Sequence, residues 1–369
     1  TVKRKEIGIP VPFGPAFEGE SIRKGDMYFE AGGTRTPAYE IVHMRANRDE
    51  ITDGQITMIG PDVDEIEEGG RVPLAFIVEV YGKKMQEDFE SVVERRIHQF
   101  VNFTNGGWHT GQRDLIWFRM SKDAVAKGLT IKDMGKVLNA KIKDEFSGII
   151  DRVQVTIITK EEEMGKYLPA AQEKYTARDE RIADLVDEAV DTFYTCTLCQ
   201  SFAPNHVCVI TPERLGLCGA INWLDAKASK EIAPTGPNQP IEIGECLDPV
   251  KGEWKGVNEV VIRDSHGKVD RFCMYTIMDN PTTSCGCFEC IMGIIPEANG
   301  LMVVNREFGG MTPAGIKFST LAGSVASRPP GSWGSGASTC TRRSSSPPTG
   351  DSTGWSGCPR CSRTPWRST

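Results

Sequence analysis

The chain has 369 residues and a formal net charge of -7, with 39% hydrophobic and 25% charged residues. Its length suits two or three domains, and no apolar run is long enough to span a bilayer. We therefore expect no membrane segment and no signal peptide, and the negative charge argues against a nucleic-acid surface, which needs concentrated positive charge.

Strand and helix patterns alternate in the first part of the chain. Runs of branched apolar residues predict strands over residues 71–81, 114–120 and 151–159. Apolar residues at helical spacing predict a helix over residues 86–102, between the first two strands. This alternation is typical of a mixed α/β domain, which we expect over roughly residues 20–160.

Signals for the start of a helix follow the strand predicted over residues 114–120. Ser121 can cap a short helix, and the TIKD stretch from Thr130 resembles a capping box. Charged helices follow to about Val190, with the glutamates at 161–163 on a solvated face. We place the first domain at residues 1–190.

The character of the sequence changes at Asp191. Its periods become shorter, turn signals appear at residues 233–240 and 279–283, and most of the twelve cysteines gather here. Clustered cysteines are typical of metal chemistry in a reducing cytoplasm, whereas a disulfide framework scatters them across a secreted domain. We predict a second domain over residues 191–323 that holds a metal cluster, and hence an α+β fold of two mixed α/β domains.

Four cysteines in one compact segment form the first part of this constellation. Cys196, Cys199, Cys208 and Cys218 are separated by two, eight and nine residues. Four thiolates from such a segment can enclose one zinc ion or a [4Fe-4S] cubane, and the spacing alone does not choose between them. A structural zinc site therefore remains one interpretation of these four residues.

Two further thiols flank a glycine in the stretch TSCGCFEC. Cys285 and Cys287 are too close along the backbone for the usual disulfide geometry. Two thiolates and two deprotonated backbone amides define a square plane, which suits Ni(II) or Cu(II), and Gly286 leaves room for the backbone to wrap round a metal. The tripeptide is therefore a candidate metal chelate. A zinc site that is already closed by four thiolates has no use for these further thiols.

These cysteines lie in stretches that resemble the acetyl-CoA synthase family, which includes the β subunit of archaeal acetyl-CoA decarbonylase/synthase. The similar stretches include CQSFAPNHVC, TPERLGLCGA, NPTTSCGCFE and GGMTPAGIKFSTLAG, and the resemblance covers residues 1–323. It implies an anaerobic CO-methylating acetyl-CoA synthase of the Wood–Ljungdahl pathway of carbon fixation. Such an enzyme condenses CO, a methyl group from a corrinoid iron–sulfur protein and coenzyme A at a Ni-Ni-[4Fe-4S] cluster. The resemblance leaves open whether it works toward synthesis or cleavage.

The resemblance also implies which residues hold this cluster. The cubane is expected on Cys196, Cys199, Cys208 and Cys218. Two nickel ions are expected on Cys285, Gly286 and Cys287, partly through backbone nitrogen. The sulfur of Cys199 would bridge to the proximal nickel, and Phe202 would shield the open position of that nickel. Cys290 matches no ligand and is expected to be a packed spare thiol.

The resemblance assigns coenzyme A to the first domain. Trp108 occupies the position that the family associates with this substrate, and Arg113 would neutralise its phosphates. The competing interpretation is a glycine-rich connecting loop with a partly buried indole.

Several other residues have simpler interpretations. His206 lies between two cysteines, but a cubane needs no fifth ligand, so we expect it to form a hydrogen bond beside the cluster. His98 is expected to be structural. Cys246 and Cys273 are expected to be buried as small apolar residues.

The resemblance also implies protein partners. In the family a further amino-terminal domain docks CO dehydrogenase, and this chain begins at Thr1 without Met and after that domain, so we expect a fragment or a processed product. We expect a cytoplasmic protein that binds neither nucleic acid nor membrane. The alternative function, from another class, is a non-catalytic iron–sulfur electron carrier in which Cys285 and Cys287 serve only the structure.

The segment after Gly323 lacks the residues of a folded core. Residues 324–369 contain no Leu, Ile, Phe, Met, Tyr or Lys, which predicts irregular structure. The family has a stretch like GVQTPGFMG at this point. When codons for that stretch are read one base later, they encode ASRPPGSW, which is the sequence of residues 326–333. A similar match occurs at residues 356–368. We therefore interpret residues 324–369 as a frame-shifted, non-native tail.

Overall fold

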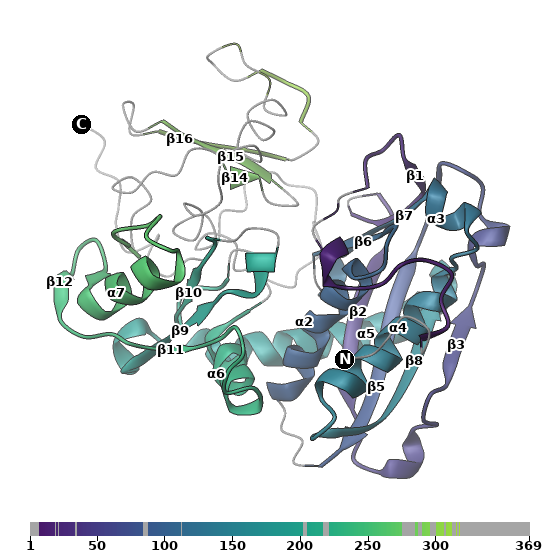
Figure 1. Cartoon of the computed structure of the whole chain (residues 1–369), viewed down its shortest axis with the longest axis horizontal. Helices are drawn as coiled ribbons and strands as arrows, with labels where there is room; N and C mark the ends of the chain where they lie inside the picture. Colours follow the sequence, from purple (N-terminus) through teal and green to yellow (C-terminus); the bar gives the residue numbers. More distant parts are fainter. Residues whose placement is uncertain are drawn as a thin grey trace. The chain divides into compact units, whose positions relative to one another are not determined.

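The structure is a computed structural model that describes most of the chain up to residue 274 and short segments beyond it. The described residues are 7–18, 20, 22–33, 35–83, 88–111, 113–201, 205–216, 221–274, 285–286, 290–295, 300–305, 308–311, 315 and 317. The chain divides into two compact units, Thr1–Ala177 and Arg178–Thr369, so the division lies before the boundary that we predict near residue 190. Both units mix helices with strands (Figure 1), which confirms the predicted α+β fold. The predicted tail lies outside the described residues.

One sheet of the first unit has the strand order β2-β5-β8-β3. Its strands are β2 Ala38–Met44, β3 Ile56–Ile59, β5 Leu74–Gly82 and β8 Ile150–Ile158. The central strands β5 and β8 pair antiparallel, and each outer strand pairs parallel with its neighbour. The apolar run in β5 is buried along most of its length, as predicted for a strand that is covered on both faces.

The second sheet of this unit has the strand order β4-β1-β7-β6. Its strands are β1 Met27–Gly32, β4 Gly70–Val72, β6 Gly107–Thr110 and β7 Trp117–Ser121. The strand predicted over residues 71–81 is divided between the two sheets at Pro73, which has no N–H to donate to a ladder. The strand predicted over residues 114–120 is shorter, because Arg113–Leu115 forms a 3-10 turn.

Two of the four described helices that accompany these sheets, α3 and α4, begin at the predicted caps. The four are α2 Asp88–Asn102, α3 Lys122–Ala126, α4 Ile131–Glu145 and α5 Glu161–Ala183. The Oγ atom of Ser121 accepts a hydrogen bond from the backbone N–H of Ala124 (3.2 Å). Thr130 Oγ1 accepts one from the N–H of Asp133 (3.1 Å), whose carboxylate accepts one from the N–H of Thr130 (3.0 Å). Both predicted helix starts are therefore confirmed.

Helices α4 and α5 cover opposite faces of the β2-β5-β8-β3 sheet. Adjacent residues of a strand point to opposite faces, so Ile157 and Ile158 of β8 show which helix lies on each face. Ile158 of β8 belongs to a buried cluster with Met164 and Tyr175 of α5. A side chain at Gly135 of α4 would come within 3.3 Å of Cδ1 of Ile157, so α4 packs closely against the other face.

Phe118 of β7 connects the cores of the two sheets. Its ring centroid lies 5.7 Å from that of Phe29 in β1 and 6.3 Å from that of Phe76 in β5. All three side chains are fully buried. Truncation of this ring therefore leaves a cavity between the two sheets.

We expect Phe118→Ala to lower the free energy of unfolding by about 3–5 kcal/mol, the usual cost of removing a buried aromatic ring. Denaturant titration measures this change. Tyr167→Ala is the matched control, because Tyr167 is an aromatic residue of the same unit that is 43% exposed. We expect the control to change the free energy by less than about 0.5 kcal/mol, and equal losses in the two variants would contradict the assigned core.

The sheets described in the second unit are antiparallel. The strands are β9 Thr192–Cys196, β10 Cys208–Ile210, β11 Pro240–Glu242, β12 Cys246–Asp248, β13 Glu253–Trp254, β14 Cys285–Gly286, β15 Cys290–Ile295 and β16 Gly300–Asn305. They form the sheets β10-β9-β11 and β14-β15-β16 and the ribbon β12-β13. The helices are α6 Trp223–Ile232 and α7 Lys255–Asp264.

Helices α6 and α7 pack against opposite faces of the β10-β9-β11 sheet. On one face Phe193 of β9 lies in a buried cluster with Val261 of α7. On the other face Tyr194, the next residue of β9, lies in a cluster with Ala226 of α6. The alternation of side chains along β9 therefore decides which residues share the α6 face.

Candidate metal centre

Two of the predicted cubane ligands face each other across β9 and β10. Cys196 and Cys208 are cross-strand partners in this antiparallel pair, and both belong to the buried cluster on the α6 face. They are 7% and 6% exposed. Residues that are directly opposite in an antiparallel pair have Cβ atoms about 4.5–5.5 Å apart. Two soft sulfur donors on one buried face fit a thiolate-bound iron–sulfur cluster.

The other predicted ligands are described only in part. Cys199 lies in the 3-10 helix Leu198–Ser201, where only its backbone is described. Cys285 and Gly286 form strand β14, which pairs with β15. Outside the described residues lie Cys218, Cys287 and Phe202. Within the described part of the chain no three His, Cys, Asp or Glu side chains form a group that could hold a metal ion, so convergence of the six sulfurs remains a prediction.

His206 lies directly beside the cysteine pair. Its Nε2 atom is 3.1 Å from Sγ of Cys208, and the side chain is buried. Burial lowers the pKa of His206 to about 4, so the imidazole is neutral at pH 7. This contact agrees with the predicted role of a histidine that forms a hydrogen bond beside a cluster ligand.

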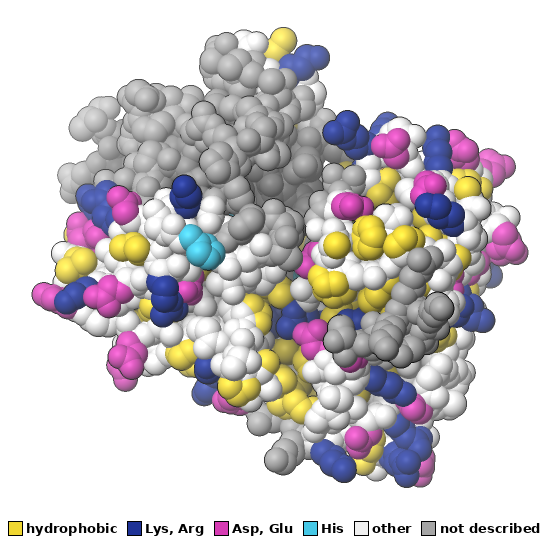
Figure 2. Space-filling view, viewed as in Figure 1, with side chains coloured by type: hydrophobic (Ala, Val, Ile, Leu, Met, Phe, Trp, Pro, Cys, Tyr) yellow, Lys and Arg dark blue, Asp and Glu magenta, His cyan; other side chains and the backbone are white. Residues whose placement is uncertain are grey.

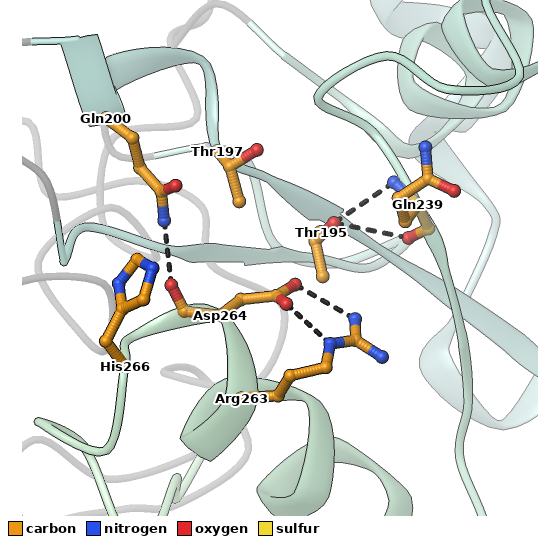
Figure 3. A pocket seen from close by; sticks show the side chains of 7 residues that line it. All are labelled: Thr195, Thr197, Gln200, Gln239, Arg263, Asp264 and His266. Atoms are coloured by element: carbon orange, nitrogen blue, oxygen red, sulfur yellow. Dashed lines mark hydrogen bonds and ion pairs between the residues drawn. The ribbon is translucent and has the colours of Figure 1, made fainter.

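A polar pocket lies on the opposite face of the same sheet. It has a volume of about 210 Å³ and is lined by Thr195, Thr197, Gln200, Gln239, Arg263, Asp264 and His266 (Figure 3). The Nε2 atom of Gln200 donates to the carbonyl oxygens of Asp264 (2.8 Å) and His206 (3.0 Å). Gln200 therefore connects the end of α7 to the backbone of the histidine that contacts Cys208.

Cys246 and Cys273, for which the sequence predicts no ligand role, differ in burial. Cys273 is fully buried, as predicted. Cys246 is exposed, so the prediction that it is buried is wrong. Cys246 begins strand β12, and the two-stranded β12-β13 ribbon leaves its side chain open to solvent.

In the first unit, Trp108 lies in a group of arginines and tryptophans on the β4-β1-β7-β6 sheet. Its ring centroid is 5.9 Å from that of Trp117. The guanidinium carbon of Arg119 lies 5.4 Å from the centroid of Trp108 and 4.8 Å from that of Trp117. The other predicted coenzyme A contact, Arg113, has its guanidinium 5.2 Å from the ring centroid of Tyr175.

Glu30 of β1 holds three arginines in this group. It accepts hydrogen bonds from Arg71 (3.0 Å), Arg119 (3.1 Å) and Arg35 (3.5 Å). Burial alone raises the pKa of Glu30, but the hydrogen bonds from Arg71 and Arg119 outweigh it and hold this pKa below its usual value. Three guanidinium groups therefore gather round one carboxylate beside Trp108. We define Glu30, Arg35, Arg71, Arg119 and Trp108 as the arginine cluster.

We expect Glu30→Gln to lower the free energy of unfolding by about 1–3 kcal/mol at pH 7, because it weakens charge-assisted hydrogen bonds to the arginines. The pKa of Glu30 is lowered in the fold, so its ionised form stabilises the protein above the ordinary pKa of 4.5 and this contribution is lost as the pH falls further. Denaturant titrations at pH 7 and pH 3 measure the difference from wild type. A loss of equal size at both pH values would contradict this assignment.

A buried acid–imidazole pair supports β6, the strand of Trp108. His109 Nε2 lies 2.8 Å from Oε2 of Glu40, and both side chains are fully buried. Burial raises the pKa of Glu40 well above its usual value and lowers that of His109 to about 3, so the pair is neutral. His98 of α2 is partly buried, and its ring stacks on that of His109 with the centroids 6.1 Å apart, which agrees with the predicted structural role.

Charges of both signs are mixed on the surface. On the face drawn in Figure 2, Lys and Arg side chains are interspersed with Asp and Glu and form no single stripe. Among the described residues, no helix is both long and apolar enough to cross a membrane.

Two family models match this chain. Residues 9–164 match the model for the CO dehydrogenase/acetyl-CoA synthase complex beta subunit, and residues 175–345 match the model for the carboxyl-terminal region of the ACS/CODH beta subunit. A relative from Methanopyrus kandleri, named acetyl-CoA decarbonylase/synthase complex subunit beta, is 49% identical over 315 residues, which are 85% of this chain and 67% of the relative. The chain belongs to the family of this beta subunit.

Other members of the beta-subunit family are of different lengths. The carbon monoxide dehydrogenase/acetyl-CoA synthase subunit alpha of Moorella thermoacetica is 59% identical over 320 residues, which are 87% of this chain and 44% of that protein. This chain therefore spans less than half the length of that relative. The match to the carboxyl-terminal model ends inside residues 324–369, which we interpret as a frame-shifted tail.

Proposed function

We propose that this chain is the catalytic core of an acetyl-CoA synthase or decarbonylase, which joins CO, a methyl group and coenzyme A or reverses that reaction. Membership of the beta-subunit family supports a catalytic role in this complex. The observation that supports it most directly is the buried cross-strand pair of Cys196 and Cys208. These are two of the four thiols that the resemblance to the acetyl-CoA synthase family assigns to a cubane.

The residues of this chain would hold and shield the metal cluster. Cys196, Cys199, Cys208 and Cys218 would bind a [4Fe-4S] cubane, and the Cys285-Gly286-Cys287 chelate would bind two nickel ions together with the sulfur of Cys199. When bound, the cluster supplies the metal site at which the acetyl group is assembled or cleaved. Burial of the α6 face keeps water away from the thiolates, and Phe202 would shield the open metal position.

We also propose that the arginine cluster contacts coenzyme A. Trp108 is partly exposed, so the indole can stack on adenine, and Arg119 already lies over its ring at 5.4 Å. Arg35 and Arg71, each about a third or more exposed at the side chain, can reach phosphate groups. Arg113 remains a candidate for a further phosphate contact.

We expect Trp108→Ala to raise the dissociation constant for coenzyme A by about 5-fold to 150-fold, which corresponds to loss of one stacking interaction. Calorimetric titration of coenzyme A into the purified chain measures this constant. Trp108→Phe keeps an aromatic face and is expected to stay within about 3-fold of wild type. Unchanged affinity in Trp108→Ala would remove this residue from the site.

The protein partners follow from the same proposal. The relatives are named as subunits of a complex, which supports partner proteins for this chain. We propose a corrinoid iron–sulfur protein as the methyl donor and CO dehydrogenase as the source of CO, in an oxygen-free cytoplasm.

Isotope exchange separates this function from a simple electron carrier. The chain is loaded anaerobically with iron, sulfide and nickel and then incubated with labelled CO and acetyl-CoA. An acetyl-CoA synthase is expected to place the label in the carbonyl carbon of acetyl-CoA. Iron and sulfide without nickel, and no exchange, would favour the electron carrier.

A further inference from the structure

We propose that His206 donates a hydrogen bond from Nε2–H to the sulfur of Cys208 and thereby raises the reduction potential of the cubane. This inference rests on the proposed function, because Cys208 must be a cluster ligand. His206 does not touch a reacting atom on this account. It is a positioning residue that acts through the thiolate.

The geometry of the contact supports a hydrogen bond to sulfur. The Nε2 atom of His206 lies 3.1 Å from Sγ of Cys208, well within the reach of a hydrogen bond to sulfur, and both residues are buried. His206 precedes Cys208 by two residues. Side chains two apart in an extended segment point the same way, so the imidazole lies on the same side as the thiol.

The chemistry of a bound thiolate fixes the direction of this hydrogen bond. A metal-bound thiolate has no proton, so it can only accept, whereas a neutral or a protonated imidazole can present an N–H at Nε2. The sulfur therefore selects the form of His206 that has its proton on Nε2. The direction of donation does not depend on the pH, provided that the cubane is bound.

The backbone of His206 is fixed by Gln200. The Nε2 atom of Gln200 donates to the carbonyl oxygen of His206 (3.0 Å) and also to that of Asp264 at the end of α7 (2.8 Å, Figure 3). Gln200 directly follows Cys199, another predicted ligand. The carboxamide thus connects the 3-10 helix of Cys199, the backbone of His206 and α7.

A hydrogen bond to a ligating sulfur stabilises the more negative, reduced form of a cluster. Hydrogen bonds to the sulfurs are among the factors that set the reduction potential of an iron–sulfur cluster. In a buried site the interaction is stronger than in water. His206 is therefore expected to make the cubane easier to reduce, and thus to set how readily it exchanges an electron with the adjacent metal.

The test is a potentiometric titration of the cubane, followed by electron paramagnetic resonance. The full chain is reconstituted with iron and sulfide, without nickel, and His206→Leu is compared with His206→Gln and with wild type. At a fixed potential we expect His206→Leu to raise the ratio of oxidised to reduced cubane about 10-fold, which is about 59 mV for a one-electron couple. His206→Gln retains an N–H that can reach the sulfur and is expected to stay within about 3-fold of wild type.

His266→Leu is the matched control, because His266 is an exposed histidine of the same unit on the pocket side of the sheet. We expect it to leave the potential unchanged. A complete cubane with the same potential in His206→Leu and wild type would overturn this inference alone. A wild-type chain that takes up no cubane would overturn the proposed function and this inference together.

A second measurement needs no hydrophobic variant. Electron nuclear double resonance of the reduced wild-type cubane, prepared with nitrogen-labelled histidine in light and heavy water, detects an exchangeable proton between histidine nitrogen and sulfur. We expect a proton signal that disappears in heavy water, together with a coupling to labelled nitrogen that is absent from His206→Gln. Absence of both signals in wild type would overturn the proposal, even if His206→Leu does not fold.

Discussion

Cys208→Ala is expected to lose most of the iron of the cubane, whereas Cys273→Ala keeps it. Both cysteines are buried in the second unit, at 6% and 0% exposure, so the two truncations remove similar amounts of packed sulfur. Only Cys208 stands opposite another predicted ligand, Cys196, in the β9-β10 ladder. A cubane needs four thiolates, and the loss of one leaves an iron site without its ligand.

Iron and sulfide analysis after anaerobic reconstitution measures this difference. We expect about four iron atoms per chain in wild type and in Cys273→Ala. Circular dichroism of both variants without metal shows whether the fold itself is retained. Equal iron in Cys208→Ala and wild type would contradict the assignment of Cys208 as a ligand.

Cys287→Ser is expected to abolish acetyl transfer, while Cys290→Ser retains it. The two residues are three positions apart, but only Cys287 belongs to the predicted nickel chelate. A serine hydroxyl is a poor ligand for nickel compared with a thiolate, so nickel should be lost with the activity. The cubane thiols are unchanged, so much of the cubane absorbance should remain.

Exchange of labelled CO into acetyl-CoA, combined with nickel analysis, measures this second difference. We expect a loss of at least about 100-fold in Cys287→Ser, since ligand loss removes the metal on which the proposed chemistry depends. Full activity in Cys287→Ser, or a similar loss in Cys290→Ser, would count against the chelate.

Much of the first unit follows from local sequence signals. The apolar run of β5 and the caps at Ser121 and Thr130 are local patterns, and the structure confirms them. Strands β1, β2, β3 and β6 were not predicted. The pairing of β1 with β7 joins residues far apart along the chain, such as Glu30 and Arg119, and a period of apolar residues does not reveal such a partner.

The arginine cluster was missed for the same reason. Glu30 and its partners Arg71 and Arg119 are 41 and 89 positions apart in sequence. Only the sheet order β4-β1-β7 brings these strands together, and each residue alone reads as an ordinary surface charge. A buried glutamate in an otherwise apolar strand is the one local signal that could have pointed to a cluster of arginines.

The cysteine pattern, by contrast, was informative without any structure. The close clustering of the cysteines predicted metal ligands, and the β9-β10 register places two of them opposite each other. Spacing could not choose between zinc and a cubane, because both accept four thiolates. It also could not find the contact of His206 with Cys208, which requires the two side chains to share one face of a strand segment.

The nickel-to-iron ratio of anaerobically purified protein tests the central claim most directly. Two nickel ions and one [4Fe-4S] cubane on the six thiols predict a ratio of about one to two. Iron at the level of a full cubane with no nickel would contradict the account.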